Sequence, residues 1–347
     1  MNDIPYNFVY NVGDLLDFDP QWRPTSSDDN EPDAAEEPTL TSSKATEENI
    51  CRFDQLPKLW ESAMSVHLCN RRYFSIEISL SESMKWHFST KEDGKETFIK
   101  LDDFLKMDRR YVRFQAVVVT VSTPPLGDEK IPISDADLTQ KLAPFVALHT
   151  TDNTFFRANI CQKNATFSRI LETFGKWGHF GSLTLEYNGP ECVTFLKQRI
   201  QNNHLRKLIL SGMWPPECQE EIHSYLVKFI KDSPSDIFRV FLPRCPDSLR
   251  ITFPMFKAFF ESKWRGNDTP KDITLSGSSE LDYNEVKSYF AEFVKNSGEE
   301  FIEWSADGKP NLVAKFAFPN GVKSGEILES CRKICRFSWI YLYKSEI

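Results

Sequence analysis

Short apolar segments with strand character recur along the chain, and most of them are followed by an amphipathic helical stretch. The segments occupy residues 114–121, 182–187, 207–210, 237–242 and 272–275. The step from Leu183 to Leu208 is 25 residues, the next to Phe238 is 30, and the next to Ile273 is 35. The longer step of 64 residues before Leu183 has room for two units, with a further strand expected near residues 153–159. Such alternation of strand and helix favours an α/β architecture.

Two α/β architectures fit this alternation. Irregular leucine-rich-repeat-like units stack their strands in chain order, whereas a doubly wound sheet reverses the strand order and binds ligands where it does so. The strands are short, a Leu-x-Leu step recurs, and no strand ends in a glycine-rich phosphate turn. These features favour the repeat architecture, and Leu208-Ile-Leu-Ser-Gly212 is echoed by Ile273-Thr-Leu-Ser-Gly277. The doubly wound sheet remains the alternative.

The two ends of the chain differ from this middle part. We expect a helix within residues 1–23, an acidic disordered linker at 24–50, a helix plus antiparallel strands at 51–110, and the repeat domain at 111–347. From about residue 300 the pattern changes to strands at 301–304, 312–318 and 337–343, with a helix at 324–334. Because a terminal repeat has to shield an open end, this section is predicted to be an antiparallel cap.

Charge is concentrated in the linker. The chain has a net charge of −8, and residues 24–49 contain eight acids and one base, which leaves −1 for all other residues. This balance argues against nucleic-acid and anionic-membrane partners. No secretory signal or membrane-length apolar run is visible, so we expect an intracellular protein, cytoplasmic or nuclear, with reduced cysteines.

Catalytic motifs are missing from the sequence. It contains no phosphate-binding loop, dinucleotide fingerprint, zinc-protease motif or nucleophile elbow. The eight cysteines are scattered without a pair at zinc-ligand spacing. We therefore expect no catalytic residues, no metal and no cofactor, and predict a non-enzymatic protein-interaction adaptor. An α/β enzyme with an unrecognised site is kept as the alternative from another class.

Two tryptophans are candidate partner-binding residues. Trp214 directly follows the strand that ends at Ser211-Gly212, and Trp264 lies between Lys263 and Arg265. Tryptophan is enriched at binding hot spots. The alternatives are that Trp214 packs over the following helix and that Trp264 simply ends one.

The N-terminal segment resembles the opening of an F-box, because Ile4-Pro5 is followed by Phe8, Val9 and Val12 at helical spacing. The chain as a whole resembles a nematode-expanded family of F-box-associated, leucine-rich-repeat-like paralogues. The residues that carry this resemblance are 2–8, the motif Asn70-Arg-Arg-Tyr-Phe74, and 205–215.

This resemblance implies a substrate-recognition subunit of a Skp1/cullin-type ubiquitin ligase, whose first helix docks on a Skp1-type adaptor and whose repeats capture an unknown target protein. The candidate docking residues are Ile4, Pro5, Phe8, Val9 and Val12. The acidic linker interrupts the F-box pattern, so the alternative is a stand-alone scaffold in which this helix caps the first repeat.

Overall fold

The computed structural model describes most of the chain from residue 65 onward. The described residues are 65–66, 68–121, 130–160, 164–202, 204–233, 237–242, 248–266, 272–281, 283–298, 301–306, 309, 311–317 and 339–344. The helix expected in residues 1–23, with Ile4, Pro5, Phe8, Val9 and Val12, lies outside them. So do the linker at 24–50 and the helix expected at 324–334.

Strands and helices alternate as the sequence predicts. The strands are β1 Arg72–Leu80, β2 Trp86–Glu92, β3 Lys95–Thr97, β4 Val112–Val121, β5 Ile131–Ile133, β6 Thr150–Asn159, β7 Ser182–Glu186, β8 Lys207–Ser211, β9 Ile237–Phe241, β10 Asp272–Gly277, β11 Val294–Ser297, β12 Phe301–Trp304, β13 Leu312–Ala317 and β14 Trp339–Lys344. The helices are α3 Leu101–Leu105, α4 Asp135–Asp137, η2 Leu138–Leu142, α5 Ala143–Ala147, α6 Ala165–Trp177, α7 Pro190–Gln201, α8 Pro216–Asp232, α9 Phe253–Phe259, η3 Phe260–Trp264, α10 Tyr283–Tyr289 and η4 Ala291–Phe293.

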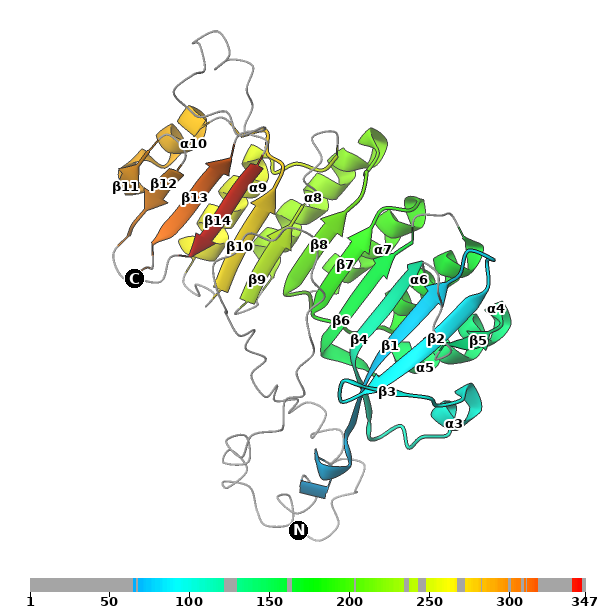
Figure 1. The fold of residues 1–347 in the computed structure, drawn as a ribbon. Helices are drawn as coiled ribbons and strands as arrows, with labels where there is room; N and C mark the ends of the chain where they lie inside the picture. Colours follow the sequence, from blue (N-terminus) through cyan, green and yellow to red (C-terminus); the bar gives the residue numbers. More distant parts are fainter. Residues whose placement is uncertain are drawn as a thin grey trace.

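The described strands form a mixed sheet in the order β11-β12-β13-β14-β10-β9-β8-β7-β6-β4-β1-β2-β3, with β5 beside β2 (Figure 1). The strands from β1 through β4 and β6 to β10 pair in parallel. The strands β11 to β14 pair antiparallel, and β14 joins them to β10. The chain is thus α/β, and the antiparallel pairing expected at its C-terminal end is confirmed.

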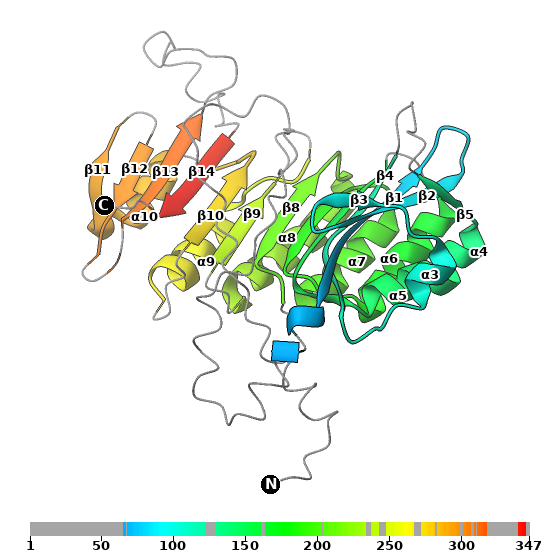
Figure 2. The ribbon, with the colours of Figure 1, turned by 60° about the horizontal axis from the view of Figure 1, so that its bottom comes forward.

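The helices between the parallel strands lie on one face of the sheet. Figures 1 and 2 show α6, α7, α8 and α9 side by side along that face, and each of these helices contacts the next. The order β6, β7, β8, β9, β10 runs in one direction, so these described strands contain no reversal point. This arrangement departs from the doubly wound alternative, which requires a reversal and helices on both faces.

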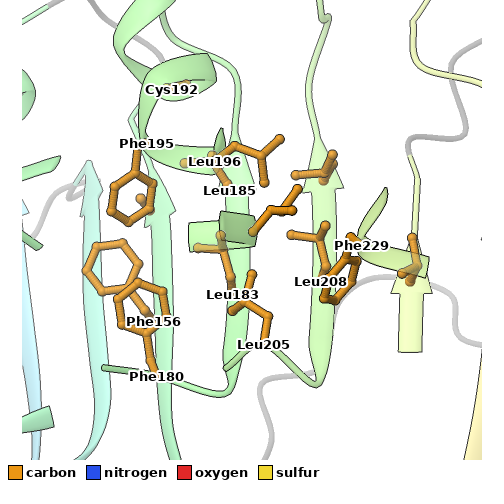
Figure 3. Packing of buried hydrophobic residues seen from close by; sticks show 14 of the residues in the cluster. Phe156, Phe180, Leu183, Leu185, Cys192, Phe195, Leu196, Leu205, Leu208 and Phe229 are labelled. Atoms are coloured by element: carbon orange, nitrogen blue, oxygen red, sulfur yellow. The ribbon is translucent and has the colours of Figure 1, made fainter. Parts of the chain in front are cut away.

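The hydrophobic core lies between this helix layer and the sheet. Strand register places apolar residues side by side in a row that crosses the parallel strands, and every member of the row is at most 1% exposed: Ile76, Val117, Phe156, Leu183, Leu208, Val240 and Leu275. Figure 3 shows Phe156, Leu183 and Leu208 of this row packed with Phe195 and Leu196 of α7. Because side chains alternate across a strand, this row also fixes which residues point to the opposite face.

The repeated Ser-Gly step has a conformational cause. Gly212 and Gly277 both have positive φ angles, of 76° and 152°. A Cβ at Gly277 would lie 2.6 Å from the Cβ of Leu242, and one at Gly212 would lie 2.9 Å from Cγ of Glu186. Glycine is needed at both positions because the chain leaves the sheet there in a conformation that other residues rarely adopt.

Two of the differences from the sequence-based prediction concern the boundary at residue 111 and the helix after β6. The sheet is continuous across residue 111, since β1 pairs with β4 in parallel, so the boundary expected there does not divide the sheet. The second is α6, a helix of 13 residues for which no helix is expected from the sequence. The Asn164 side chain caps it by accepting hydrogen bonds from the amides of Thr166 and Phe167. Asn164-Ala-Thr166 also matches the glycosylation pattern Asn-x-Thr, so the sequence alone does not identify Asn164 as a helix cap.

Candidate protein-binding face

Among the described residues, the helices cover one face of β6, β7, β8 and β9 and leave the other uncovered; this uncovered face is here called the open face (Figure 1). Strand alternation decides what lies on it. In β7, Leu183 and Leu185 are buried beneath the helices, whereas Ser182, Thr184 and Glu186 are half-buried on the open face. The same alternation in β8 and β9 places polar, charged and apolar side chains there together.

Strand register arranges these side chains in two rows. In one row, Lys207 of β8 lies beside Arg239 of β9. In the next, Ile209 lies beside Phe241, and the row continues through Thr184 to Arg157 of β6. A paired basic site and a paired apolar site therefore adjoin each other along the same two strands.

Carboxylates border these rows at two places. On β1, Glu77 accepts a hydrogen bond from Nζ of Lys130, which lies 2.6 Å from its Oε1. At the end of β7, burial raises the pKa of Glu186 above its ordinary value, while the positive charge of Arg157 works against that rise. A carboxylate so placed is held near a cation yet is harder to ionise than one in water.

On the covered side, two buried cations bind helix ends. Arg199 of α7 is 4% exposed and donates to the carbonyl oxygens of Gly175 and Gly178 at the end of α6. Lys263 of η3 is also 4% exposed and donates to the carbonyl oxygen of Ser233 at the end of α8. In both cases a cation from the next unit satisfies the unpaired carbonyls at the C-terminus of the preceding helix, where positive charge is favourable.

Burial alters the proton affinity of both cations. The pKa of Arg199 is lowered to about 10 and that of Lys263 to about 8, because charged groups are disfavoured in the interior. Asp232 opposes the shift at Lys263. Because both side chains donate hydrogen bonds to backbone carbonyls of a neighbouring helix, we interpret them as structural groups.

A small titratable cluster lies at the N-terminal ends of β7 and β8. The ring centroids of His179 and His204 are 5.3 Å apart, and Nδ1 of His204 is 3.7 Å from Oδ1 of Asp152. Burial and then the neighbouring His204 lower the pKa of His179. Within the described part of the chain, no three His, Cys, Asp or Glu side chains are arranged to hold a metal ion.

The thiols in the described part of the chain do not form disulfides: Cys69, Cys192 and Cys218 are all free. Burial raises the pKa of Cys192 to about 11, so it is a neutral thiol at physiological pH. A neutral thiol is a poor nucleophile.

An open groove of ≈ 560 Å³ lies where α8 meets the start of α9. Gln219, Glu220 and His223 of α8 line it together with Thr252 and Glu280. Burial lowers the pKa of His223. Titratable groups meet in this groove, but it is a depression on the surface rather than an enclosed cleft.

Neither candidate tryptophan is available to a partner, because Trp214 and Trp264 are both 0% exposed. Trp214 packs against Tyr187 with ring centroids 5.2 Å apart, and its Nε1 donates to the carbonyl of Ser211 at 2.8 Å. Trp264 packs against Phe260 at 4.7 Å. The expectation of exposed anchors is therefore wrong, because both rings fill the core.

The basic residues of the open face are absent from the sequence-based candidates. The sequence does contain a signal for them, because each is a basic residue next to apolar core residues of a strand. Lys207 directly precedes Leu208, and Arg239 lies between Phe238 and Val240. The signal becomes informative only when β8 and β9 are aligned in register, and single-strand patterns do not give the register.

None of the helices in the described ranges is long and apolar enough to span a membrane. The sequence matches no protein-family model, and neither a curated protein nor a solved structure matches the chain.

Proposed function

We propose that this chain is a non-enzymatic protein-interaction adaptor, built from irregular leucine-rich-repeat-like units, that holds its partner on the open face. The observation that carries this proposal is the one-sided placement of the helices, which leaves the outward residues of four successive parallel strands uncovered by helices. Extended surfaces of this kind are what stacked repeats use for binding.

The character of the open face supports a protein partner. Arg157, Thr184, Ile209 and Phe241 share one row and are all half-buried. Such a mixture of apolar and hydrogen-bonding groups is typical of protein interfaces.

The test is affinity purification of the full-length chain from cells, with the co-purifying proteins quantified by mass spectrometry. Thr184→Arg places a long charged side chain in the middle of the open face. Glu172→Arg places the same side chain on the exposed side of α6 and is the matched control. We expect a defined set of proteins to be lost with Thr184→Arg and kept with Glu172→Arg. Identical sets for both variants would refute the open face as the binding surface.

A link to ubiquitin ligation is the finer part of the proposal. It rests on the resemblance of the N-terminal segment to an F-box, in which Ile4, Pro5, Phe8, Val9 and Val12 would contact a Skp1-type adaptor. The test is a pull-down of such an adaptor with wild type, Pro5→Ala and Phe8→Asp. Loss of binding in the variants, with unchanged circular dichroism, supports the ligase role. Failure of the wild type to bind would leave a stand-alone scaffold.

A further inference from the structure

We infer that the groove between α8 and the start of α9 binds an arginine side chain of a partner protein. This groove, here called the α8 groove, has a volume of ≈ 560 Å³ and is lined in part by Glu220 and His223 of α8 and by Glu280, which follows β10. None of its described lining residues belongs to the open face. The inference therefore goes beyond the proposed function, and it assigns the chain a second binding surface.

One wall of the α8 groove is a single side of α8. Glu220, His223 and Val227 line it at spacings of three and four residues, which places them on the same side of the helix. The start of this helix is held in place, because the Gln219 side chain donates to the carbonyl oxygen of Trp214 at 2.8 Å. Trp214 is buried, so this wall is anchored to the core.

Two short segments that pair with each other form the opposite wall. The amide of Glu280 donates to the carbonyl oxygen of Ile251 at 3.3 Å, next to a parallel bridge between the two segments. This pairing holds Glu280 close to Thr252, which also lines the groove. Ser248 connects this wall to the start of α8, because its hydroxyl accepts a hydrogen bond from the amide of Trp214 at 3.0 Å. Both walls are therefore fixed by the fold.

The charge of the lining favours a cation. Glu220 and Glu280 are both exposed, and the described residues that line the groove include no lysine or arginine. Within the described part of the chain, neither carboxylate takes part in an ion pair. A cation that enters the groove thus meets one negative charge on each wall and no competing positive charge on the lining.

His223 adds an acceptor that lacks a donor. Burial lowers the pKa of its ring, while the charge of Glu280 and a hydrogen bond to the backbone of Arg250 work against that shift. The ring is therefore neutral at physiological pH and does not repel a cation. Its Nε2 is buried and has no hydrogen-bond partner within the described residues. A buried polar atom without a partner costs free energy, and a ligand that brings a donor removes this cost.

A guanidinium matches this set of groups better than other charged or polar side chains do. It carries five N–H donors in a planar fork and no acceptor, whereas the groove offers two carboxylates and an imidazole nitrogen. The fork can contact acceptors on both walls at once, but an ammonium is a compact and strongly hydrated point charge. Pro216, Val227 and Pro254 also line the groove, and their apolar surfaces suit the methylene stem of the same side chain. An acidic peptide or a nucleic acid would be repelled by Glu220 and Glu280.

The test uses NMR spectroscopy of the full-length chain with isotope-labelled histidine rings. The chain has six histidines, and His223→Gln identifies the signal of His223. The probe is a pentapeptide with capped ends, in which a central arginine is flanked by leucine and then serine on each side, so the guanidinium is its only charge. The groove variant is Glu220→Lys/Glu280→Lys. The matched control, Glu172→Lys/Glu292→Lys, makes the same change in net charge at exposed positions outside the groove.

We expect the peptide to shift the signal of His223 in wild type in a saturable way. The control should bind within about twofold of wild type, and the groove variant at least about tenfold more weakly. A peptide with citrulline in place of arginine keeps nearly the same shape without the charge, and should bind at least about threefold more weakly. Affinity should also fall as salt rises. An unshifted His223 signal in wild type, or equal affinities of wild type and the groove variant, would overturn the inference.

Three further measurements separate the possible failures. If the signals of the other histidines show that the groove variant is unfolded, Glu280→Gln removes one charge without reversing it and should weaken binding by about two- to fivefold. A lysine peptide that binds as tightly as the arginine peptide would overturn the assignment to a guanidinium. Thr184→Arg on the open face should bind the peptide as wild type does. If wild type does not bind the peptide but Thr184→Arg still loses cellular partners, the α8 groove is refuted and the adaptor function survives.

Discussion

The two faces of one sheet carry opposite kinds of side chain. On the covered face, Leu208 and Val240 are paired neighbours and both are 0% exposed. One residue earlier on the same two strands, Lys207 and Arg239 are paired on the open face and are only half-buried. The difference shows that a single residue step along a strand separates positions buried in the core from positions that point to the open face.

The strongest way to test this contrast is to shorten neighbouring side chains of β8. Leu208→Ala should lower the free energy of unfolding by about 2–5 kcal/mol, because it leaves a cavity in the packed core. Ile209→Ala, on the open face, should cost clearly less, about 1–2 kcal/mol, because its side chain is only half-buried and no closed cavity forms. Urea denaturation followed by circular dichroism measures both values. Comparable losses at the two positions would mean that the faces do not differ as described.

A second test concerns the helix layer above the covered face. Arg199→Met should destabilise the protein by about 1–3 kcal/mol, because the carbonyls of Gly175 and Gly178 lose their donor, while removal of a buried charge offsets part of that loss. Gln201→Met, exposed on the same helix, should change the stability by less than about 0.5 kcal/mol. Unfolding in urea again provides the measurement. A stability increase in Arg199→Met would show that desolvation of the guanidinium outweighs its hydrogen bonds.

The covered face was largely predictable from the sequence, because it follows from local periodicity. The ends of the segments 182–187, 207–210 and 237–242 agree with those of β7, β8 and β9 to within one residue. Their alternating residues identify the buried row without any knowledge of the neighbours. The antiparallel pairing of β12 with β13 was predictable for the same reason, from two short alternating segments.

The open face was not predictable in the same way, because its character depends on which residues of different strands become neighbours. Lys207 and Arg239 are 32 residues apart, and only the register of β8 and β9 pairs them. The tryptophan predictions failed for a related reason. A sequence does not show whether a loop turns outward, and Trp214 turns inward onto Tyr187.

A third test uses pH and the buried amine of Lys263. Its pKa in the folded protein is about 8, lower than the 10.5 of an exposed lysine, so the fold disfavours the charged form. Between these values the unfolded chain binds more protons than the folded one, and stability therefore rises with pH over that range. Below about pH 8 the penalty is fully present. We expect wild type to gain melting temperature relative to Lys263→Met between about pH 7 and about pH 9.5.

Melting curves of wild type, Lys263→Met and the exposed control Lys231→Met provide this comparison. The control should track the wild type across the pH range, because Lys231 is exposed on α8. A difference between wild type and Lys263→Met that does not change with pH would contradict a lowered pKa.

The smallest expected effect tests whether the open face contributes to the stability of the fold. Thr184→Arg, in the middle of the open face on β7, should change the free energy of unfolding by about 0.5 kcal/mol or less, because the substitution leaves the packed core untouched. Glu172→Arg, on the exposed side of α6, should have an equally small effect and is the matched control. Urea denaturation followed by circular dichroism measures both values. A clearly larger loss in Thr184→Arg than in Glu172→Arg would mean that Thr184 contributes to the fold, and that the two faces of β7 are less separate in role than their side chains suggest.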